Sequence, residues 1–220
     1  MKQSSKTTIG ILGLGLFGSS VARTLAQNNV DVIAMDKNME HLEEVIDEIA
    51  LGVQGDFTKL EQLKEAGFGE CDEVVIASAR KLEDTILAIL NLQKLHVPKI
   101  TVKTKNIEYQ EVLKKVGATR VILPEVAMGY QTAMMLANPT VHELMKLDSH
   151  YNIIEFPHKE HWVGKKIEQI DFRKNFDVNI IALQHEHSND FSIEFGPDYI
   201  IQKGDLFIGI TNDSGMKKLM

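Results

Sequence analysis

The stretch Gly13-Leu14-Gly15-Leu16-Phe17-Gly18 decides the fold of this chain. It matches G-x-G-x-x-G and follows an apolar run at residues 8–12 directly, while apolar residues after it recur at helical spacing. At such a strand–helix junction Gly13 permits a tight turn, Gly15 leaves room for phosphates, and Gly18 lets the helix pack closely on the sheet. The alternative is that the glycines serve only strand–helix packing.

The alternation of strand and helix patterns continues to residue 124. Asn38 is predicted to cap the second helix, and Thr58 the third. Repeated β-then-α units predict an α/β, Rossmann-like, doubly wound parallel sheet. The predicted strands are 8–12, 30–35, 52–56, 74–77, 99–103 and 119–123, and the predicted helices are 17–26, 38–49, 60–66, 82–95 and 108–116.

Pro124 interrupts this rhythm, and a predicted helix over 125–137 ends where Pro139 disfavours helical backbone at Asn138. Tyr130, Met134, Met135 and Leu136 lie on this helix and serve either core packing or a subunit interface. The rest of the chain predicts a small α+β domain. Its strands are expected at 152–156, 178–183, 191–195 and 206–210, around one helical segment at 163–170. We therefore divide the chain into a nucleotide-binding domain (6–124), a connector helix (125–139) and a C-terminal domain (140–220).

Composition excludes several classes of protein. The 220 residues carry a net charge of −7 without a basic run, which argues against a nucleic-acid partner. The one cysteine, Cys71, fits a reducing compartment, and the neighbouring Asp72 and Glu73 oppose thiolate formation. Residues 7–22 are uncharged like part of a secretory leader, but the glycine motif explains them better. No stretch reaches the ~20 apolar residues that span a bilayer. We expect a soluble, cytoplasmic protein.

Further nucleotide contacts are expected at the carboxyl ends of the strands, where ligands of such sheets bind. Asp36 ends the second predicted strand, 21 residues after Gly15, and can accept hydrogen bonds from ribose hydroxyls. As an alternative it is a surface acid. Asp56 follows the third strand and can bind an adenine amino group.

The end of the fourth predicted strand belongs to the same crevice. Ala77 and Ser78 should lie beside the adenosine or the phosphates. Arg80 either pairs with a phosphate or is a solvated loop charge.

Two patterns in the C-terminal domain could suggest catalysis or a metal. Tyr199 and Lys203 have Y-x-x-x-K spacing, but Pro197 and Gly204 predict strand and turn there instead of one helical face. The histidine pairs His158/His161 and His185/His187 could share a metal, although exposed histidines account for them better. We therefore predict that the protein is not an enzyme.

The chain resembles the KtrA/TrkA family of potassium-uptake regulators, which are built from RCK domains. The resemblance covers nearly the whole chain. It rests on residues 11–18, Asp36, 55–58, 74–77, Lys103, 115–118 and Pro124-Glu125, and in the C-terminal domain on 170–173 and 204–209.

The resemblance implies a cytoplasmic regulatory subunit that forms dimers and an octameric ring on a membrane potassium channel or transporter. ATP and ADP, or NAD and NADH in some members, would act as regulatory ligands. Competing interpretations are a nucleotide sensor with a soluble target and a small NAD-dependent oxidoreductase. The implied nucleotide contacts are Gly13, Gly15, Leu16, Phe17, Gly18, Asp36, Lys37, Asp56, Phe57, Ala77, Ser78, Lys103 and Glu125.

Two positions bear on the choice of nucleotide. Leu16 stands where close relatives carry an arginine that reaches the terminal phosphate, so we expect weaker discrimination of ATP. Glu125 matches a residue that helps the family hold a divalent cation, Mg²⁺ or Ca²⁺, near the phosphates. The alternative is a first-turn acid favoured by the helix dipole.

The resemblance also implies a cyclic di-AMP site between two copies of the C-terminal domain. Arg173 would bind a phosphate and Asn179 an adenine edge, while Ile167, Val178, Ile180 and Pro197 would form apolar walls. In the alternative, Arg173 pairs with Asp171 or Asp177 and the isoleucines belong to the core.

Overall fold

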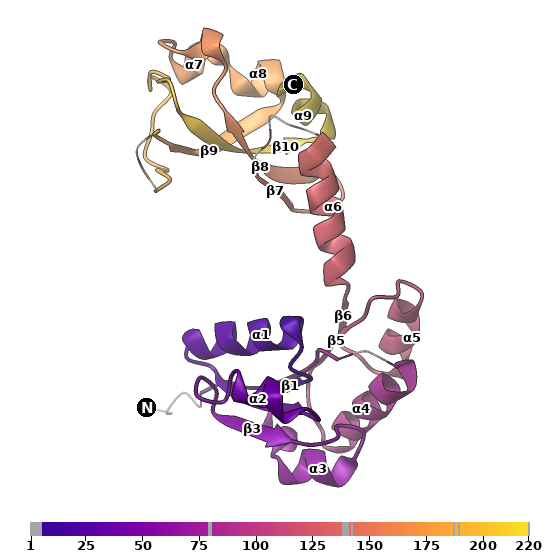
Figure 1. The fold of residues 1–220 in the computed structure, drawn as a ribbon. Helices are drawn as coiled ribbons and strands as arrows, with labels where there is room; N and C mark the ends of the chain where they lie inside the picture. The colour runs from indigo at the N-terminus through magenta and orange to yellow at the C-terminus, as the bar shows by residue number, and fades with distance from the viewer. Residues whose placement is uncertain are drawn as a thin grey trace, which may run out of the picture. The chain divides into compact units, whose positions relative to one another are not determined.

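A computed structural model of the chain describes residues 6–78, 81–137, 141, 143–186, 188 and 190–219. The chain forms two compact units, Met1–Val126 (unit 1) and Ala127–Met220 (unit 2), drawn in Figure 1. Arg80 and His187, whose roles the sequence left open, lie outside the described residues. Among the described residues, no helix has the length and apolar character needed to cross a bilayer.

Unit 1 is built on a six-stranded sheet in which every neighbouring pair is parallel. The strand order is β3-β2-β1-β4-β5-β6, so the order reverses between β1 and β4. This confirms the predicted doubly wound sheet. The strands are β1 (Thr8–Leu12), β2 (Asp31–Asp36), β3 (Leu51–Gln54), β4 (Glu73–Ile76), β5 (Ile100–Lys103) and β6 (Arg120–Ile122).

Helices cover both faces of this sheet (Figure 1). Neighbouring strand residues alternate between the two cores: Ile11 packs with α1 and α2, whereas Leu12 packs with α3, α4 and α5. Burial on both faces explains why the central strands are continuously apolar. The helices are α1 (Leu16–Gln27), α2 (Met39–Glu43), α3 (Leu60–Glu65), the 3₁₀ turn η1 (Phe68–Glu70), α4 (Leu82–Lys94) and α5 (Tyr109–Val116).

Two local predictions for unit 1 need correction. The helix expected over 38–49 ends at Glu43, because residues 44–48 continue as turns that mix i−3 and i−4 hydrogen bonds. Its predicted cap is confirmed, since the Asn38 side chain accepts from the backbone of Glu40. Thr58 is not a helix cap: Lys59 takes the cap position of α3, and Thr58 donates to Asp56 instead.

Unit 2 contains a four-stranded antiparallel sheet in the order β7-β8-β10-β9. The helix α6 (Pro124–Ala137) contains the division between the units. The strands are β7 (Glu143–Lys146), β8 (Tyr151–Pro157), β9 (Val178–Gln184) and β10 (Leu206–Asn212), and the helices are η2 (Glu160–Trp162), α7 (Ile167–Ile170), α8 (Phe172–Phe176) and α9 (Asp213–Leu219).

An aromatic cluster forms the centre of unit 2. Trp162 packs edge-on against Phe172, with ring centroids 5.0 Å apart, and the cluster also contains Phe156, Phe176 and Phe207. Met134 and Met135 of α6 pack against this core, so both serve core packing. On the same helix Tyr130 and Leu136 are exposed.

The strand predicted over 191–195 is wrong. Only an isolated bridge between Ser192 and Leu183 forms there, because the rest of the segment pairs with no strand in the described part of the chain. Four elements of unit 2 escaped prediction: β7, η2, α8 and α9. The α8 helix begins at Phe172 and is capped by Asp171, which has a left-handed backbone (φ 46°) and whose side chain accepts from Lys174 N.

Candidate functional site

The glycine loop joins β1 to α1, and its first and last glycines are required by packing. Gly13 has φ +94°, and a Cβ there would lie 2.4 Å from Cβ of Ser78. A Cβ on Gly18 would lie 1.9 Å from the carbonyl oxygen of Gly13. Substitution at either position would therefore force the start of α1 away from the sheet.

Gly15 differs from the other two glycines. It occupies the N-cap position of α1 with φ −67°, a value open to any residue, and a Cβ there would meet nothing within 4 Å. Packing therefore gives no reason for a glycine at this position. Free space at the N-terminus of a 12-residue helix is what a phosphate group needs, since helical N–H groups point into it.

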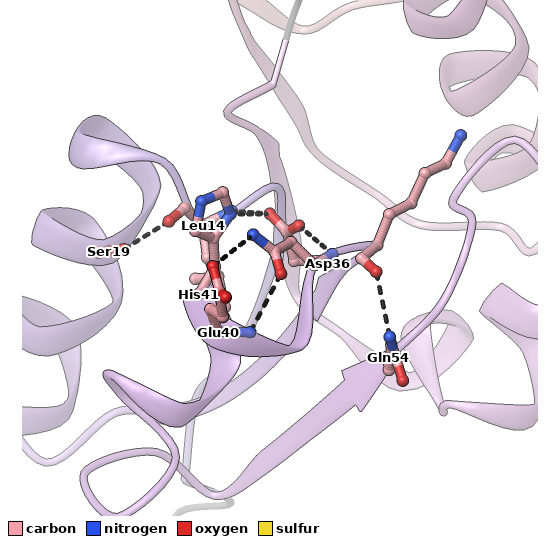
Figure 2. Close-up of polar contacts among 8 residues, drawn as sticks. Leu14, Ser19, Asp36, Glu40, His41 and Gln54 are labelled. Carbon is pink, nitrogen blue, oxygen red and sulfur yellow. Dashed lines mark hydrogen bonds and ion pairs between the residues drawn. The ribbon is translucent and has the colours of Figure 1, made fainter.

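The backbone of Leu14 is held on both sides, as Figure 2 shows. Its N–H donates to Oδ2 of Asp36 over 2.6 Å, and its carbonyl accepts from Oγ of Ser19 over 2.7 Å. The Leu14 side chain is buried in the core between the sheet and α1. Two hydrogen bonds and burial therefore fix the position of Leu14 in the loop.

Asp36 stands at the end of β2 and holds the loop in place. Its Oδ1 accepts from Asn38 N over 2.8 Å, and Nδ1 of His41 lies 3.3 Å from its Oδ2. Burial alone would raise the pKa of Asp36, but the hydrogen bonds from Leu14 and Asn38, together with the nearby His41, outweigh burial and lower it. The carboxylate is thus ionised at neutral pH and is more than a surface acid. Sequence reasoning missed the roles of Ser19 and His41, which have no signature of their own.

Lys37 and Asp56 form a second pair of predicted contacts. Nζ of Lys37 lies 3.1 Å from Oδ2 of Asp56, and the backbone carbonyl of Lys37 accepts from Gln54 over 3.2 Å. Oδ1 of Asp56 accepts from both the N–H and the hydroxyl of Thr58. This network links the ends of β2 and β3.

Three further predicted contacts come together from separate elements. Lys103, at the end of β5, lies 2.9 Å from Oε1 of Glu125 in the first turn of α6. Its Nζ also stands 5.3 Å from the ring centroid of Phe17 in α1. The hydrogen bond from Lys103 lowers the pKa of Glu125. Both lysines among the predicted contacts are therefore paired with carboxylates.

The remaining predicted nucleotide contacts differ in how accessible they are to a ligand. The N–H groups of Ala77 and Ser78 both donate to the carbonyl of Leu12, which keeps the end of β4 against the loop. Leu16 is 96% exposed at the start of α1. The assignment of the Phe57 side chain as a nucleotide contact must be corrected, because this side chain is buried in the core and has little surface to offer a ligand.

In unit 2, Arg173 and Asn179 lie together. Nε and Nη2 of Arg173 donate to Oδ1 of Asn179 over 2.9 and 2.6 Å. The ion pair of Arg173 with Asp171 or Asp177, one part of the predicted alternative, is wrong, because Asp171 caps α8 and Asp177 pairs with Lys218.

The predicted apolar walls of that site are only partly accessible. Val178 is fully buried and cannot line a ligand site, which corrects its assignment. Ile167 and Ile180 are half-buried against the core, and Pro197 is exposed. The Pro197 carbonyl accepts from Glu168, next to Ile167.

The patterns that could have suggested catalysis have structural roles. Tyr199 and Lys203 lie outside any helix, as predicted, and the Tyr199 hydroxyl donates to the buried Asp205 over 2.9 Å. His185 also lies 3.2 Å from Asp205. Cys71 is buried, which raises its pKa to about 11, with Asp72 and Glu70 adding to the effect. Among the described residues, no three histidine, cysteine or acidic side chains form a metal cluster.

A parallel sheet of this order, a glycine loop at the start of α1 and an acid at the end of β2 that anchors the loop define a Rossmann-type nucleotide-binding domain. Comparison with known proteins agrees with this class. The family model of the TrkA-N domain matches residues 9–124, and that of the TrkA-C domain matches residues 153–220.

Two proteins of Bacillus subtilis (strain 168) are similar over most of their length. Ktr system potassium uptake protein C is 30% identical over 81% of both chains. Ktr system potassium uptake protein A is 27% identical over 94% of this chain and 93% of its own. The solved GsuK channel bound to NAD shares the fold, with a TM-score of 0.63 and 18% identity, and the match covers all of this chain but 40% of that one. This chain belongs to the KtrA/TrkA family.

Proposed function

We propose that this chain is the cytoplasmic regulatory subunit of a membrane potassium channel or transporter. Residues 6–124 would bind an adenine nucleotide, and residues 140–220 would form the C-terminal regulatory domain. Residues 125–139 would connect these two domains. Family membership supports the role in potassium uptake, since both Bacillus relatives are named as Ktr system proteins. The chain would reach the membrane through its partner, and dimers would assemble to an octameric ring.

The open space at Gly15 is the observation that supports nucleotide binding most directly. Packing requires the glycines on either side of it but not a glycine at this position, and a phosphate needs the space that a side chain here would fill. ATP, ADP, NAD and NADH all carry the phosphates that the loop suits. The GsuK channel shares the fold in a structure that contains NAD, which makes NAD or NADH a ligand to test first.

Thermal unfolding in the presence of each nucleotide tests this proposal. A ligand that binds the folded state alone stabilises it by about 2.7 kcal/mol at 100 times its Kd. Potassium uptake by cells that depend on this subunit should then respond to the same substitutions that remove binding. The absence of stabilisation by all four nucleotides at millimolar concentration would contradict the proposal.

Replacing Asp36 tests the anchor of the loop. Asp36→Ala should weaken the affinity for NAD and for ATP by a similar factor, roughly tenfold. The carboxylate would bind the ribose of either nucleotide, and it also holds the loop through Leu14 N–H. It should also lower the free energy of unfolding by about 1–3 kcal/mol, since Leu14 N–H loses its acceptor. Calorimetry and chemical denaturation measure the two effects. Asp47→Ala, which removes an exposed acid in the same unit, is the control and should change neither.

Replacing Leu16 tests the choice of nucleotide. Leu16 places no charge at the start of α1, and Lys37 and Lys103 are already paired with acids, so a third phosphate gains little here. Leu16→Arg should raise the affinity for ATP over ADP by about tenfold or more, because it adds a charge-assisted hydrogen bond. Leu16→Gln is the uncharged control. A strong ATP preference of the unmodified chain in the presence of a chelator would contradict this account.

Glu125 would support a divalent cation only with help from the nucleotide. Its carboxylate is half-exposed and binds Lys103, so a Mg²⁺ or Ca²⁺ ion would have to displace the ammonium group and take its other ligands from phosphates and water. We propose that a divalent cation increases ATP affinity in this way. In the alternative, Glu125 is a first-turn acid that the helix dipole favours, and a divalent cation then has no effect on ATP affinity.

For unit 2 we propose a cyclic di-AMP site that uses Arg173 and Asn179. Their mutual hydrogen bonds keep a cation and an amide side by side on the surface of one domain. Ile167, Ile180 and Pro197 remain as apolar neighbours, without Val178. The second half of the site would come from a second copy of this chain.

A further inference from the structure

A second cavity in unit 1 lies apart from the glycine loop, between the N-terminal ends of α4 and α5. Its volume is about 320 Å³. Residues 81–83 at the start of α4 and residues 104–106 after β5 form its walls, with Tyr109 and Leu113 of α5. None of the predicted nucleotide contacts lines it. We refer to this cavity as the α4–α5 pocket.

The pocket is rich in hydrogen-bond donors that have no protein partner within the described part of the chain. Lys81 Nζ, Lys105 Nζ, Asn106 Nδ2 and the Tyr109 hydroxyl belong to this group. The first backbone N–H groups of α4 join them, because no side chain of a described residue caps this 13-residue helix. Such a concentration of donors suits a ligand with several acceptor oxygens.

Charge and shape narrow the class of ligand. Two lysines oppose one acid, Glu83, so the lining side chains carry one net positive charge, which Glu125 near Lys105 balances in part. Amides at a helix N-terminus together with ammonium groups are the donors that phosphate prefers. The side chain of Leu82 and the ring of Tyr109 are half-buried and line the pocket, so its walls also hold an apolar surface.

We propose that the α4–α5 pocket binds a small phosphomonoester with a compact apolar or aromatic part. The phosphate would lie against Lys81, Lys105 and the start of α4, and the organic part against Leu82 and Tyr109. A volume near the lower end of the usual range for ligand sites suits such a molecule and is small for a dinucleotide. The site shares no lining residue with the one proposed for the nucleotide at the glycine loop.

Phenyl phosphate is a direct probe, titrated by calorimetry into the full chain. Lys81→Gln and Lys105→Gln should each weaken binding by about tenfold, because each removes one charge-assisted bond. Glu83→Gln should tighten binding, because it removes the opposing charge. The control Lys99→Gln changes an exposed lysine just before β5, at the opposite end of this strand from residues 104–106, and should have no effect. Thermal unfolding checks that each variant is folded.

Further titrations distinguish binding in the α4–α5 pocket from binding at the glycine loop and from a general effect of charge. With the glycine loop obstructed by Gly15→Val, binding of phenyl phosphate should persist, and its loss would assign the probe to the loop. An equal loss of phenyl phosphate affinity in Lys99→Gln would show that the overall charge of the protein causes the effect, and it would overturn the proposal. Benzoate or inorganic phosphate binding as tightly as phenyl phosphate would overturn the phosphomonoester class. No binding of phenyl phosphate at millimolar concentration would overturn the site itself.

Discussion

Gly15→Val should abolish nucleotide binding while leaving a folded protein. The isopropyl group would occupy the space at the N-terminus of α1 that phosphates need, so affinity for ATP, ADP and NAD should each fall by at least about 100-fold, or roughly 2.7 kcal/mol. The ligand-free chain should lose only about 1 kcal/mol, because valine is a poor N-cap but meets no neighbouring atom. Calorimetry and chemical denaturation measure the two quantities.

Gly18→Ala is the matched contrast in the same loop. Its Cβ would lie 1.9 Å from a backbone oxygen that cannot move freely, so stability itself should fall, by about 1–3 kcal/mol. The pair separates a glycine needed for packing from one needed for a ligand. Unchanged nucleotide affinity in Gly15→Val would remove the loop from the binding site, and equal destabilisation by both substitutions would show that Gly15 also serves packing.

Arg173→Ala should weaken cyclic di-AMP binding to the full chain by about 10- to 100-fold, because a guanidinium group makes charge-assisted bonds to a phosphate. The side chain is exposed and bonds only to Asn179 among the described residues, so stability should change little. Lys174→Ala removes an exposed cation from the same helix and is the control. Equilibrium dialysis with cyclic di-AMP measures the affinity.

Nucleotide affinity at the glycine loop should be nearly unchanged in Arg173→Ala. Any coupling between the two sites should stay within the ~1–3 kcal/mol usual for allostery. An equal loss in Lys174→Ala would mean that long-range charge, and not a phosphate contact, carries the effect. If the unmodified chain binds no cyclic di-AMP at high micromolar concentration, the proposed site in unit 2 is wrong.

The α/β alternation and the glycine loop could be predicted from the sequence because both are local. Apolar runs such as Val74–Ile76 are continuous, since helices cover both faces of the sheet. The role of Asp36 at the end of the second strand was predicted from its spacing of 21 residues after Gly15 in the sequence. The short elements of unit 2 were harder to predict: α8 depends on the left-handed backbone of Asp171, and the run 191–195 had strand-forming residues but no partner strand among the described residues.

The sequence by itself therefore determined the class of fold, the family and the chain segments that meet at the carboxyl edge of the first sheet. Only the tertiary structure decided what each residue does there. It placed Phe57 and Val178 inside cores, joined Arg173 to Asn179, and fixed Leu14 between Asp36 and Ser19. The physical reason is range: periodicity and turn chemistry act between neighbours in the chain, whereas burial and hydrogen-bond partners depend on residues brought together from distant segments.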